Sequence, residues 1–352
     1  MRQYWSRKAA SLKPYTAGEQ PKQKNIIKLN TNENAYPPSP KVGEAVTKAA
    51  ATLQKYPQAD CGALARAVAE TEGIPAQNVF CANGSDEALA LCFLAFFDPD
   101  RPVYTPDITY SFYTVWADLF NLCLEQIPLD DDYTVPVEKF KHAPGGVVIA
   151  NPNAPTGMAI GAKDIREIIQ SNSGVVIVDE AYVAFGGKSV IQWIDKYQNL
   201  VVVRTLSKSH ALAGLRVGYV AASRNLIDAL EAVRDSFNSY PVDTLAQAGA
   251  AAAILDVDYY KNATHKIVEA REYTARELKK MGVLVLQSST NFLFIRPAKP
   301  AGDVYRELKE KGILVRWFDK PRTREYLRVS IGTMEEMKCL LGELQILLKS
   351  LQ

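Results

Sequence analysis

The hydrophobic positions of the first 240 residues fall into short apolar runs separated by segments with helical periodicity. The runs are rich in β-branched residues and end in polar or turn residues, which is typical of buried strands. We expect strands at 78–82, 101–106, 121–129, 145–152, 174–182 and 200–206. We expect helices at 41–72, broken at YPQADCG, at 83–97 after a short loop, at 110–120 and at 162–171. This alternation predicts an α/β fold with a mostly parallel sheet and helices on both faces.

The pattern changes at about residue 240. Two long helical stretches cover 240–255 and 259–282, and four alternating segments follow that are typical of strands, at 283–289, 291–297, 313–318 and 326–331. A helix separates the second and third of these segments, and another ends the chain. Residues before about 40 are rich in Lys, Asn and Pro and lack periodicity. We therefore expect an N-terminal arm (1–35), a large domain (36–240) and a smaller α+β domain (241–352).

Composition and charge exclude several classes of protein. The chain has 352 residues with 41 basic and 39 acidic side chains, a net charge of +2, so nothing suggests a nucleic-acid or membrane surface. Its five cysteines lack metal-site spacing and are expected to be free thiols in a reducing compartment. No apolar run approaches the roughly 18 residues of a membrane span, and the N-terminus lacks the apolar segment of a signal peptide. We expect a cytoplasmic protein without a metal site.

Polar residues gather where the predicted parallel strands end. In open parallel sheets, ligands bind at the carboxyl ends of the strands, and these ends lie along one edge. The segments directly after the strands are 83–86, 106–110, 151–157, 179–182 and 205–208. We therefore expect these five segments to meet around one binding site.

Two of these segments carry unusual charges. Asp179 ends the apolar run GVVIV, so its carboxylate is partly buried and needs a cationic partner or strong donors. Lys208 stands between two serines just after the last strand, in RTLSKSHALAGLRVGY. A pyridine nitrogen beside a buried carboxylate stays protonated, and a nearby lysine can react with an aldehyde on the same ring. Both groups occur in pyridoxal phosphate.

The remaining groups of that cofactor also have candidate partners. Tyr110 is a candidate for stacking on the ring, and Tyr182 for donating to its phenolate oxygen. A helix that starts near residue 84 presents free backbone N–H groups to an anion. The candidate phosphate-binding residues are Gly84, Ser85, Asp86, Thr205, Ser207 and Arg216.

Six blocks of the sequence resemble, in order, those of the histidinol-phosphate aminotransferase family, which has the fold type I architecture of pyridoxal-phosphate-dependent transferases. They are KLNTNENAYPPSP (28–40), KYPQAD (55–60), NGSDEA (83–88), DEAYVAF (179–185), RTLSKSHALAGLRVGY (204–219) and YLRVSIGT (326–333). Any one block is a weak signal, but six in order with the right separations, over nearly the whole chain, are a strong one. The resemblance implies an aminotransferase that exchanges an amino group between histidinol phosphate and 2-oxoglutarate.

The resemblance also implies individual roles. Lys208 would bind the cofactor covalently and carry a proton, Asp179 would keep the ring nitrogen protonated, and Tyr182 would hydrogen-bond the phenolate oxygen. Tyr56 would reach the phosphate in the neighbouring subunit, which implies a homodimer with shared sites. Arg328, with Arg316 as a second candidate, would bind the anionic groups of the substrates. Further substrate contacts are implied for Tyr15 and Asn32.

The chain departs from the family pattern in the segment NPNAPTG. The family usually has an asparagine directly before Pro-Thr-Gly, where it donates to the phenolate oxygen, and this chain has Ala154 there. Asn153 stands next to it and is a candidate replacement, although an extended backbone would point its side chain elsewhere.

Other interpretations stay open at this point. An aromatic aminotransferase and a threonine-phosphate decarboxylase are alternative enzymes, and a pyridoxal-phosphate transcription regulator is the alternative outside enzymology. That regulator needs a DNA-binding domain, whereas only about 30 residues precede LNTNEN. The tyrosines could be packing residues, Arg328 a surface residue of a strand, and His210 a satisfied loop histidine beside Lys208 instead of a base.

Overall fold

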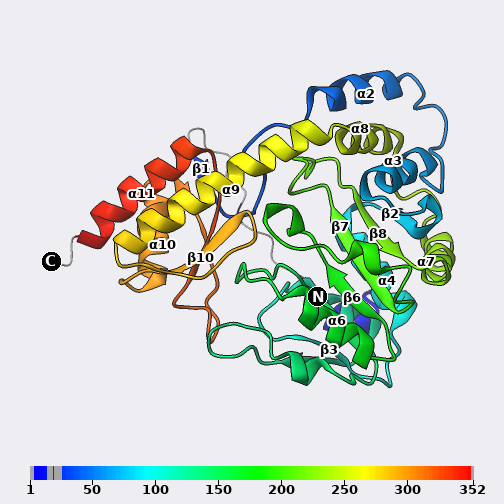
Figure 1. The fold of residues 1–352 in the computed structure, drawn as a ribbon, viewed down its shortest axis with the longest axis horizontal. Helices are drawn as coiled ribbons and strands as arrows, with labels where there is room; N and C mark the ends of the chain where they lie inside the picture. Colours follow the sequence, from blue (N-terminus) through cyan, green and yellow to red (C-terminus); the bar gives the residue numbers. More distant parts are fainter. Residues whose placement is uncertain (1–3, 14–18, 20–25, 350–352) are drawn as a thin grey trace.

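The computed structural model describes residues 4–13, 19 and 26–349. Figure 1 shows a large part built around a twisted sheet and a smaller part at one side, with the long helix α9 (Val257–Lys280) running from one to the other. Within the described residues, no helix is long and apolar enough to cross a membrane.

The large part contains a seven-stranded sheet in the order β2-β8-β7-β6-β5-β3-β4. Five neighbouring strands are parallel, and β8 is antiparallel to both β2 and β7. The mostly parallel sheet predicted from the sequence is confirmed, whereas β8 was not predicted. The strands are β2 (Val79–Ala82), β3 (Val103–Pro106), β4 (Leu124–Ile127), β5 (Gly146–Ala150), β6 (Val176–Asp179), β7 (Leu200–Thr205) and β8 (Gly218–Ala222).

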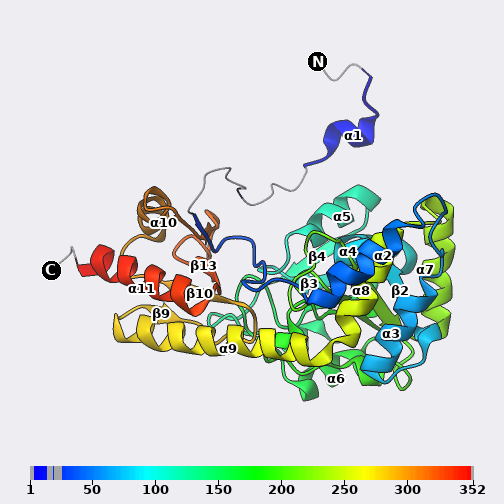
Figure 2. The same ribbon diagram turned by 90° about the horizontal axis from the view of Figure 1, so that it is seen from above.

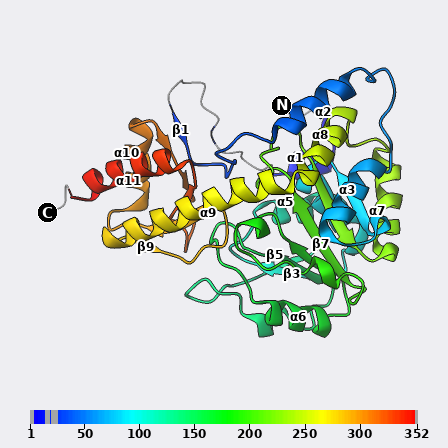
Figure 3. The ribbon, with the colours of Figure 1, turned by 45° about the horizontal axis from the view of Figure 1, so that its top comes forward.

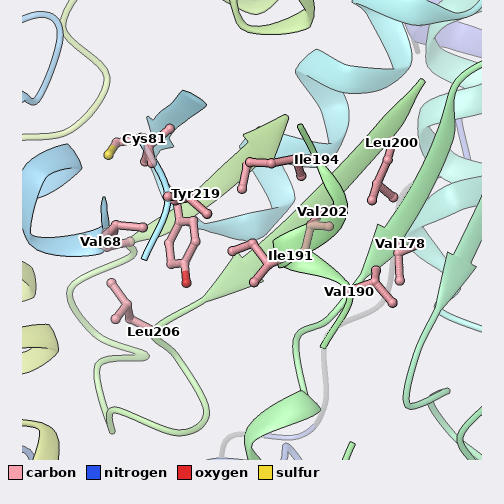
Figure 4. Close-up of a cluster of buried hydrophobic side chains, with 14 of the residues drawn as sticks. Val68, Cys81, Val178, Val190, Ile191, Ile194, Leu200, Val202, Leu206 and Tyr219 are labelled. Carbon is pink, nitrogen blue, oxygen red and sulfur yellow. The ribbon is translucent and has the colours of Figure 1, made fainter. Parts of the chain in front are cut away.

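Successive side chains of each central strand point to opposite faces of this sheet, as the strand geometry requires. In β7, Val202 belongs to the apolar cluster on one face, while Val201 and Val203 belong to the cluster on the other. Figure 4 shows the first cluster, where Val178 and Val202 lie near Val190 and Ile191. Its helices are α2 (Pro40–Ala50), α3 (Gly62–Glu72), α6 (Ala162–Ser171) and α8 (Thr244–Leu255). The opposite face is covered by α4 (Gly84–Phe96), α5 (Phe112–Phe120) and α7 (Arg224–Phe237).

The small part is built on an antiparallel four-stranded sheet in the order β12-β13-β10-β9. The predicted strand at 313–318 is divided, because β11 pairs with the N-terminal strand β1 while β12 pairs with β13. Figure 2 shows α11 and α10 against this sheet. The elements are β1 (Ile27–Lys28), β9 (Leu284–Val285), β10 (Phe292–Arg296), α10 (Ala301–Glu310), β11 (Ile313–Leu314), β12 (Arg316–Trp317), β13 (Leu327–Ser330) and α11 (Met334–Lys349).

Helix α8 packs on the large part, although the sequence pattern assigned it to the smaller domain. Its buried residues Ala246, Ala250 and Ile254 share the core cluster of α2 and α3. Ile267 and Leu278 of α9, in contrast, belong to the core of the small sheet. Figure 3 shows α9 leaving α8 and passing along the small part. On this packing we propose that the domain boundary lies within α9, and not at residue 240.

Short helical segments complete the described structure. Near the N-terminus, Lys8 of α1 donates hydrogen bonds to the Asp118 carbonyl and to Oδ1 of Asn121, next to α5. These segments are α1 (Arg7–Ser11) and the 3-10 turns η1 (Ala76–Asn78), η2 (Val137–Phe140), η3 (Val183–Phe185) and η4 (Ile191–Trp193).

Candidate active site

A cavity of about 430 Å³ opens at the carboxyl ends of the parallel strands. All five segments that the sequence predicted to meet at this edge contribute to its wall, each with at least one residue. The cavity is lined by Thr31, Glu33, Ser85, Asp86, Tyr110, Ala150, Ala154, Asp179, Ala181, Tyr182, Thr205, Ser207, Lys208, Ala213, Gly214 and Arg216.

Lys208 projects into this cavity from the loop after β7. Its Nζ donates a hydrogen bond to the carbonyl oxygen of Thr31 at 3.2 Å. The side-chain amide of Asn34 holds the lysine backbone by donating to its carbonyl at 2.8 Å. Burial, and then the positive charge of Arg328, lower the pKa of Lys208 to about 8. A substantial fraction of this amine is therefore uncharged, and nucleophilic, near neutral to mildly alkaline pH.

Asp179 is the last residue of β6, and only 5% of its surface is exposed. Its Oδ2 accepts a hydrogen bond from the hydroxyl of Tyr113 at 2.8 Å, and its Oδ1 accepts from the backbone N–H of Ala181 at 3.1 Å. Burial raises the pKa of Asp179 to about 6 despite these donors. Among the described residues, no basic side chain forms an ion pair with it. The carboxylate is thus prepared for a cation that the described part of the chain does not provide.

The start of α4 and the loop after β7 form a corner of the cavity that contains the guanidinium of Arg216. Arg216 donates to Oδ2 of Asp86 at 3.2 Å and to Oγ of Ser207 at 3.4 Å. Gly84 has a φ of +86°, and a Cβ there would lie 2.8 Å from a guanidinium nitrogen of Arg216. The hydroxyl of Thr205 accepts the backbone N–H of Ser207 at 3.2 Å. A guanidinium, hydroxyl groups and the N-terminus of a thirteen-residue helix together suit a phosphate group.

Two tyrosines line the wall between this corner and Asp179. The hydroxyl of Tyr110 donates to Oδ1 of Asp86 at 2.7 Å. The hydroxyl of Tyr182 accepts a hydrogen bond from the Asn32 amide at 2.9 Å, and burial raises the pKa of Tyr182. Asn32 is buried, and its Oδ1 accepts from the hydroxyl of Ser330 on β13. Asn32 thus joins the small sheet to the phenol of Tyr182 at the cavity wall.

The structure does not bring the side chain of Asn153 to the cavity, so the prediction that Asn153 binds the cofactor needs correction. Its amide donates to the carbonyl of Ile108 at 2.9 Å and to Oγ1 of Thr156 at 3.0 Å. Its oxygen accepts from the hydroxyl of Thr109 at 2.7 Å. These bonds occupy the amide and direct it toward the 108–109 segment, as expected for an extended backbone. Ala154 lines the cavity in its place.

The two candidate anion-binding arginines face each other on a hairpin of the small sheet. We call residues 316–328 the arginine hairpin; it comprises β12, the loop 318–326 and the start of β13. Arg316 and Arg328 are Cα partners in the antiparallel pair, and both guanidinium groups lie over the ring of Phe318, at 5.4 and 5.5 Å. Like charges directly opposite each other destabilise a strand pair, so this arrangement favours a shared anionic ligand.

Tyr56 lies away from the cavity of its own chain. Tyr56 is 84% exposed and stacks on Tyr240, with ring centroids 5.0 Å apart. It does not line the cavity of its own chain. Tyr15 lies outside the described residues.

Comparison with known proteins identifies the family to which this site belongs. The sequence profile of aminotransferase class I and II matches residues 24–344, which is most of the chain. The chain belongs to the class I and II aminotransferase family. It is 48% identical, over 340 residues, to a histidinol-phosphate aminotransferase of Clostridium acetobutylicum, covering 96% of this chain and 97% of that protein. It is 46% identical to a histidinol-phosphate aminotransferase of Acinetobacter baylyi, with 97% of each covered. The resemblance noted from the six sequence blocks is confirmed.

Solved structures of aminotransferases share the fold. Histidinol-phosphate aminotransferase from Sinorhizobium meliloti, in complex with pyridoxal-5'-phosphate, superimposes with a TM-score of 0.88 and 25% identity, covering 99% of this chain and 98% of that chain. An aromatic aminotransferase from Pyrococcus horikoshii superimposes with a TM-score of 0.81 and 21% identity, covering 93% and 97%. The predicted fold class is confirmed. The similarity to the aromatic aminotransferase, at 21% identity, shows a shared fold alone.

Sequence reasoning missed several residues of this aminotransferase site. Tyr113 was not singled out within the predicted helix 110–120, yet its hydroxyl donates to Asp179. Glu33 lines the cavity and pairs with Lys28 at 2.5 Å. The block KLNTNENAYPPSP contains Thr31, Glu33 and Asn34, but no periodicity places this segment against the loop after β7. The only available signal was the density of polar residues in that block.

Proposed function

We propose that this aminotransferase exchanges an amino group between L-histidinol phosphate and 2-oxoglutarate, with pyridoxal 5'-phosphate as its cofactor. One observation carries the proposal: a single cavity combines a lysine of lowered pKa, a buried carboxylate that no basic side chain of the described residues pairs with, and an anion-binding corner at a helix N-terminus. The identity of 46–48% to histidinol-phosphate aminotransferases over 96–97% of the chain supports the choice of substrate.

The residues of the cavity fit pyridoxal phosphate. Asp179 supplies the counter-charge for a protonated ring nitrogen, and the donor set of Ser85, Ser207 and Arg216 suits the phosphate. Tyr110 and Tyr182 flank the space between these groups. Gly84 supports this fit, because any side chain there would displace Arg216. When bound, pyridoxal phosphate supplies an electron sink for the substrate α-carbon.

Lys208 has two tasks in this proposal. Its lowered pKa makes a neutral amine available to hold the cofactor covalently. Its Nζ, when not bonded to the cofactor, would move a proton at the substrate α-carbon as a general base and acid. The Asn34 contact to the lysine backbone fixes the loop during this exchange.

Arg328 and Arg316 would bind the anionic groups of both substrates. A guanidinium pairs bidentately with a carboxylate and with a phosphate, so one pair of arginines serves 2-oxoglutarate and histidinol phosphate in turn. Arg328 also donates to the carbonyl of Asn30 at 2.9 Å, which connects it to the segment that carries Thr31 and Asn32. The positive charge of Arg328 contributes to the lowered pKa of Lys208, although Arg328 is not among the residues that line the cavity.

We further propose a cytoplasmic homodimer with shared sites. The exposure of Tyr56 on a loop away from its own cavity supports a role in the site of a second copy. All five cysteines are free thiols, in agreement with a reducing compartment.

A two-part assay tests the function. The purified holoenzyme is given histidinol phosphate with 2-oxoglutarate, and glutamate formation is measured. A second sample receives threonine phosphate, and release of carbon dioxide is measured. We expect glutamate in the first sample and no carbon dioxide in the second. Carbon dioxide without glutamate would instead identify a lyase. If neither product forms, a third sample with phenylalanine or tyrosine and 2-oxoglutarate, giving glutamate, would identify an aromatic aminotransferase.

A further inference from the structure

One side chain of the arginine hairpin makes several hydrogen bonds to the large part. Arg322, at the tip of the hairpin, donates to Oδ2 of Asp107 at 3.0 Å, to the carbonyl of Leu129 at 2.8 Å and to that of Asp130 at 2.9 Å. Oδ1 of Asp107 accepts the backbone N–H of Leu129 at 2.9 Å. In return, the hydroxyl of Tyr133 donates to the carbonyl of Arg322. Each part therefore donates hydrogen bonds to the other.

An apolar cluster lies beneath these polar contacts. Leu129 and Tyr133 of the large part pack with Phe294 and Tyr326 of the small sheet, and Phe318 of the arginine hairpin joins them. Tyr326 stacks on Phe294 with centroids 4.7 Å apart and meets Tyr133 at 5.3 Å. The two parts are thus connected here by their own small core, separate from the one along α9.

The backbone at both ends of the contact is unusual. Arg322 has a φ of +66° and Tyr133 a φ of +67°, in the left-handed region that non-glycine residues seldom adopt. Such conformations cost free energy and persist when surrounding contacts hold them. Here each residue hydrogen-bonds or packs against the other across the boundary. The two residues with left-handed backbone therefore contact each other directly across the boundary.

Asp107 and Arg322 each belong to a segment that also carries candidate site residues. On the large part, Asp107 begins the segment that continues through Thr109 to Tyr110 at the cavity wall. On the small part, the hairpin that ends in Arg322 carries Arg316 and Arg328. The contact therefore connects the segment that forms the cofactor wall with the strands that bear the substrate-binding arginines.

We propose that Arg322 and Asp107 form a clasp that positions the arginine hairpin over the cavity. Arg322 is a positioning residue, since it touches neither the cavity lining nor the lysine, and the clasp sets the fraction of molecules in which Arg316 and Arg328 can reach the substrate anion. This inference rests on the proposed function of the two arginines. When the binding-competent arrangement is only partly populated, apparent affinity falls by that fraction while the chemistry of the bound state is unchanged.

Three variants test the clasp: Arg322→Gly, Asp107→Asn and the double variant. Glycine suits the left-handed backbone at 322, so the first variant removes the side chain without adding strain. Asp107→Asn keeps the size of the side chain and tests the clasp if Arg322→Gly folds poorly. The matched control is Arg324→Ala, because Arg324 lies on the same loop and pairs only locally with Asp319 at 3.7 Å.

For the clasp variants we expect KM for histidinol phosphate to rise roughly 5- to 50-fold, as for other couplings between sites. We expect kcat to change less than about threefold, since the bound state is intact. The double variant should resemble Arg322→Gly alone, because both substitutions break one contact. Arg324→Ala should match the wild type. A loss of kcat at constant KM, additive effects, or an equal effect of Arg324→Ala would overturn the proposal.

Two measurements without substrate turnover separate this proposal from the proposed function. The first is hydrogen exchange at the Leu129 amide, which should be faster in the clasp variants and unchanged in Arg324→Ala. The second is calorimetric binding of inorganic phosphate to the holoenzyme, which should weaken by a similar factor to the rise in KM. A wild type inactive on histidinol phosphate would refute the function alone. Unchanged exchange and unchanged phosphate binding in Arg322→Gly and Asp107→Asn would refute the clasp.

Discussion

The hydroxyl of Tyr113 donates a hydrogen bond of 2.8 Å to Oδ2 of Asp179, at the bottom of the cavity. This bond and the one from the Ala181 N–H are the hydrogen bonds that the described residues offer this carboxylate. They do not compensate for its burial, since the pKa of Asp179 is still raised from 3.8 to about 6. The buried charge of Asp179 therefore lowers the stability of the protein when no cation is bound beside it.

The first prediction concerns the pH dependence of stability in cofactor-free protein. Because the folded-state pKa of Asp179 lies above the unfolded value, its contribution is present below pH 3.8 and is lost as pH rises through about 6. The difference corresponds to about 3 kcal/mol. Asp179→Asn removes this titration. We expect the free energy of unfolding of Asp179→Asn, relative to the wild type, to increase from pH 5 to pH 8 in urea titrations.

In the holoenzyme we expect Asp179→Asn to be harmful, because the variant lacks the counter-charge for the cofactor ring. We expect a fall in kcat of several orders of magnitude, in line with an electrostatic contribution of about 3–5 kcal/mol.

For the cofactor-free protein, a difference in the free energy of unfolding between Asp179→Asn and the wild type that stays constant between pH 5 and pH 8 would contradict the first prediction.

The second prediction identifies the covalent residue. Borohydride treatment of holoenzyme should fix the mass of the cofactor on the peptide that contains Lys208, as read by mass spectrometry. Exposed Lys188, on the loop after β6, is the internal control and should remain unlabelled. Lys208→Ala should keep weak cofactor binding and lose turnover. Label on another lysine would remove Lys208 from its proposed role.

The third prediction concerns Gly84. A Cβ at this position would lie 2.8 Å from Arg216, so Gly84→Ala should displace the guanidinium from the phosphate-binding corner. We expect the Kd for pyridoxal phosphate to rise about 10- to 100-fold, the value of one hydrogen bond to a charged group. Gly282→Ala is the control, because Gly282 also has a positive φ of +77° but nothing lies near its Cβ position. Equal Kd values for the two variants would argue against this account of the corner.

The fourth prediction concerns the second subunit. If Tyr56 serves the neighbouring site, a mixed dimer of Tyr56→Phe and Lys208→Ala has one site with both defects and one site with neither. Co-refolding the two impaired proteins should then recover activity, up to that of one intact site per mixed dimer. If subunits demonstrably exchange and no activity returns, Tyr56 acts in its own subunit.

The strand-end rule accounts for what could be predicted of the site. The residues at a strand end or within a few residues after it all line one cavity: Ser85, Asp86, Asp179, Tyr182 and Lys208. The position of a residue after a parallel strand fixes its place at the sheet edge, so no knowledge of the loops was needed.

Features that depend on packing between distant segments were not predictable in this way. β8 has the small-residue sequence GYVAA, whose pattern is weak, and its antiparallel place between β2 and β7 follows from their pairing. Helix α8 is rich in alanine and apolar on several sides, so its sequence does not reveal which core it joins. The orientation of Asn153 depends on the carbonyl of Ile108, and the Arg322–Asp107 contact joins residues 215 positions apart.

The most direct test of the central claim is a competition experiment with the wild-type holoenzyme. Equal concentrations of histidinol phosphate and phenylalanine are supplied with limiting 2-oxoglutarate, and the consumption of each amine is followed. The ratio of the two rates equals the ratio of their kcat/KM values. Because the two arginines favour a phosphorylated amine, we expect histidinol phosphate to be consumed at least about 100-fold faster. Equal consumption, or a preference for phenylalanine, would contradict the assignment of histidinol phosphate as the substrate.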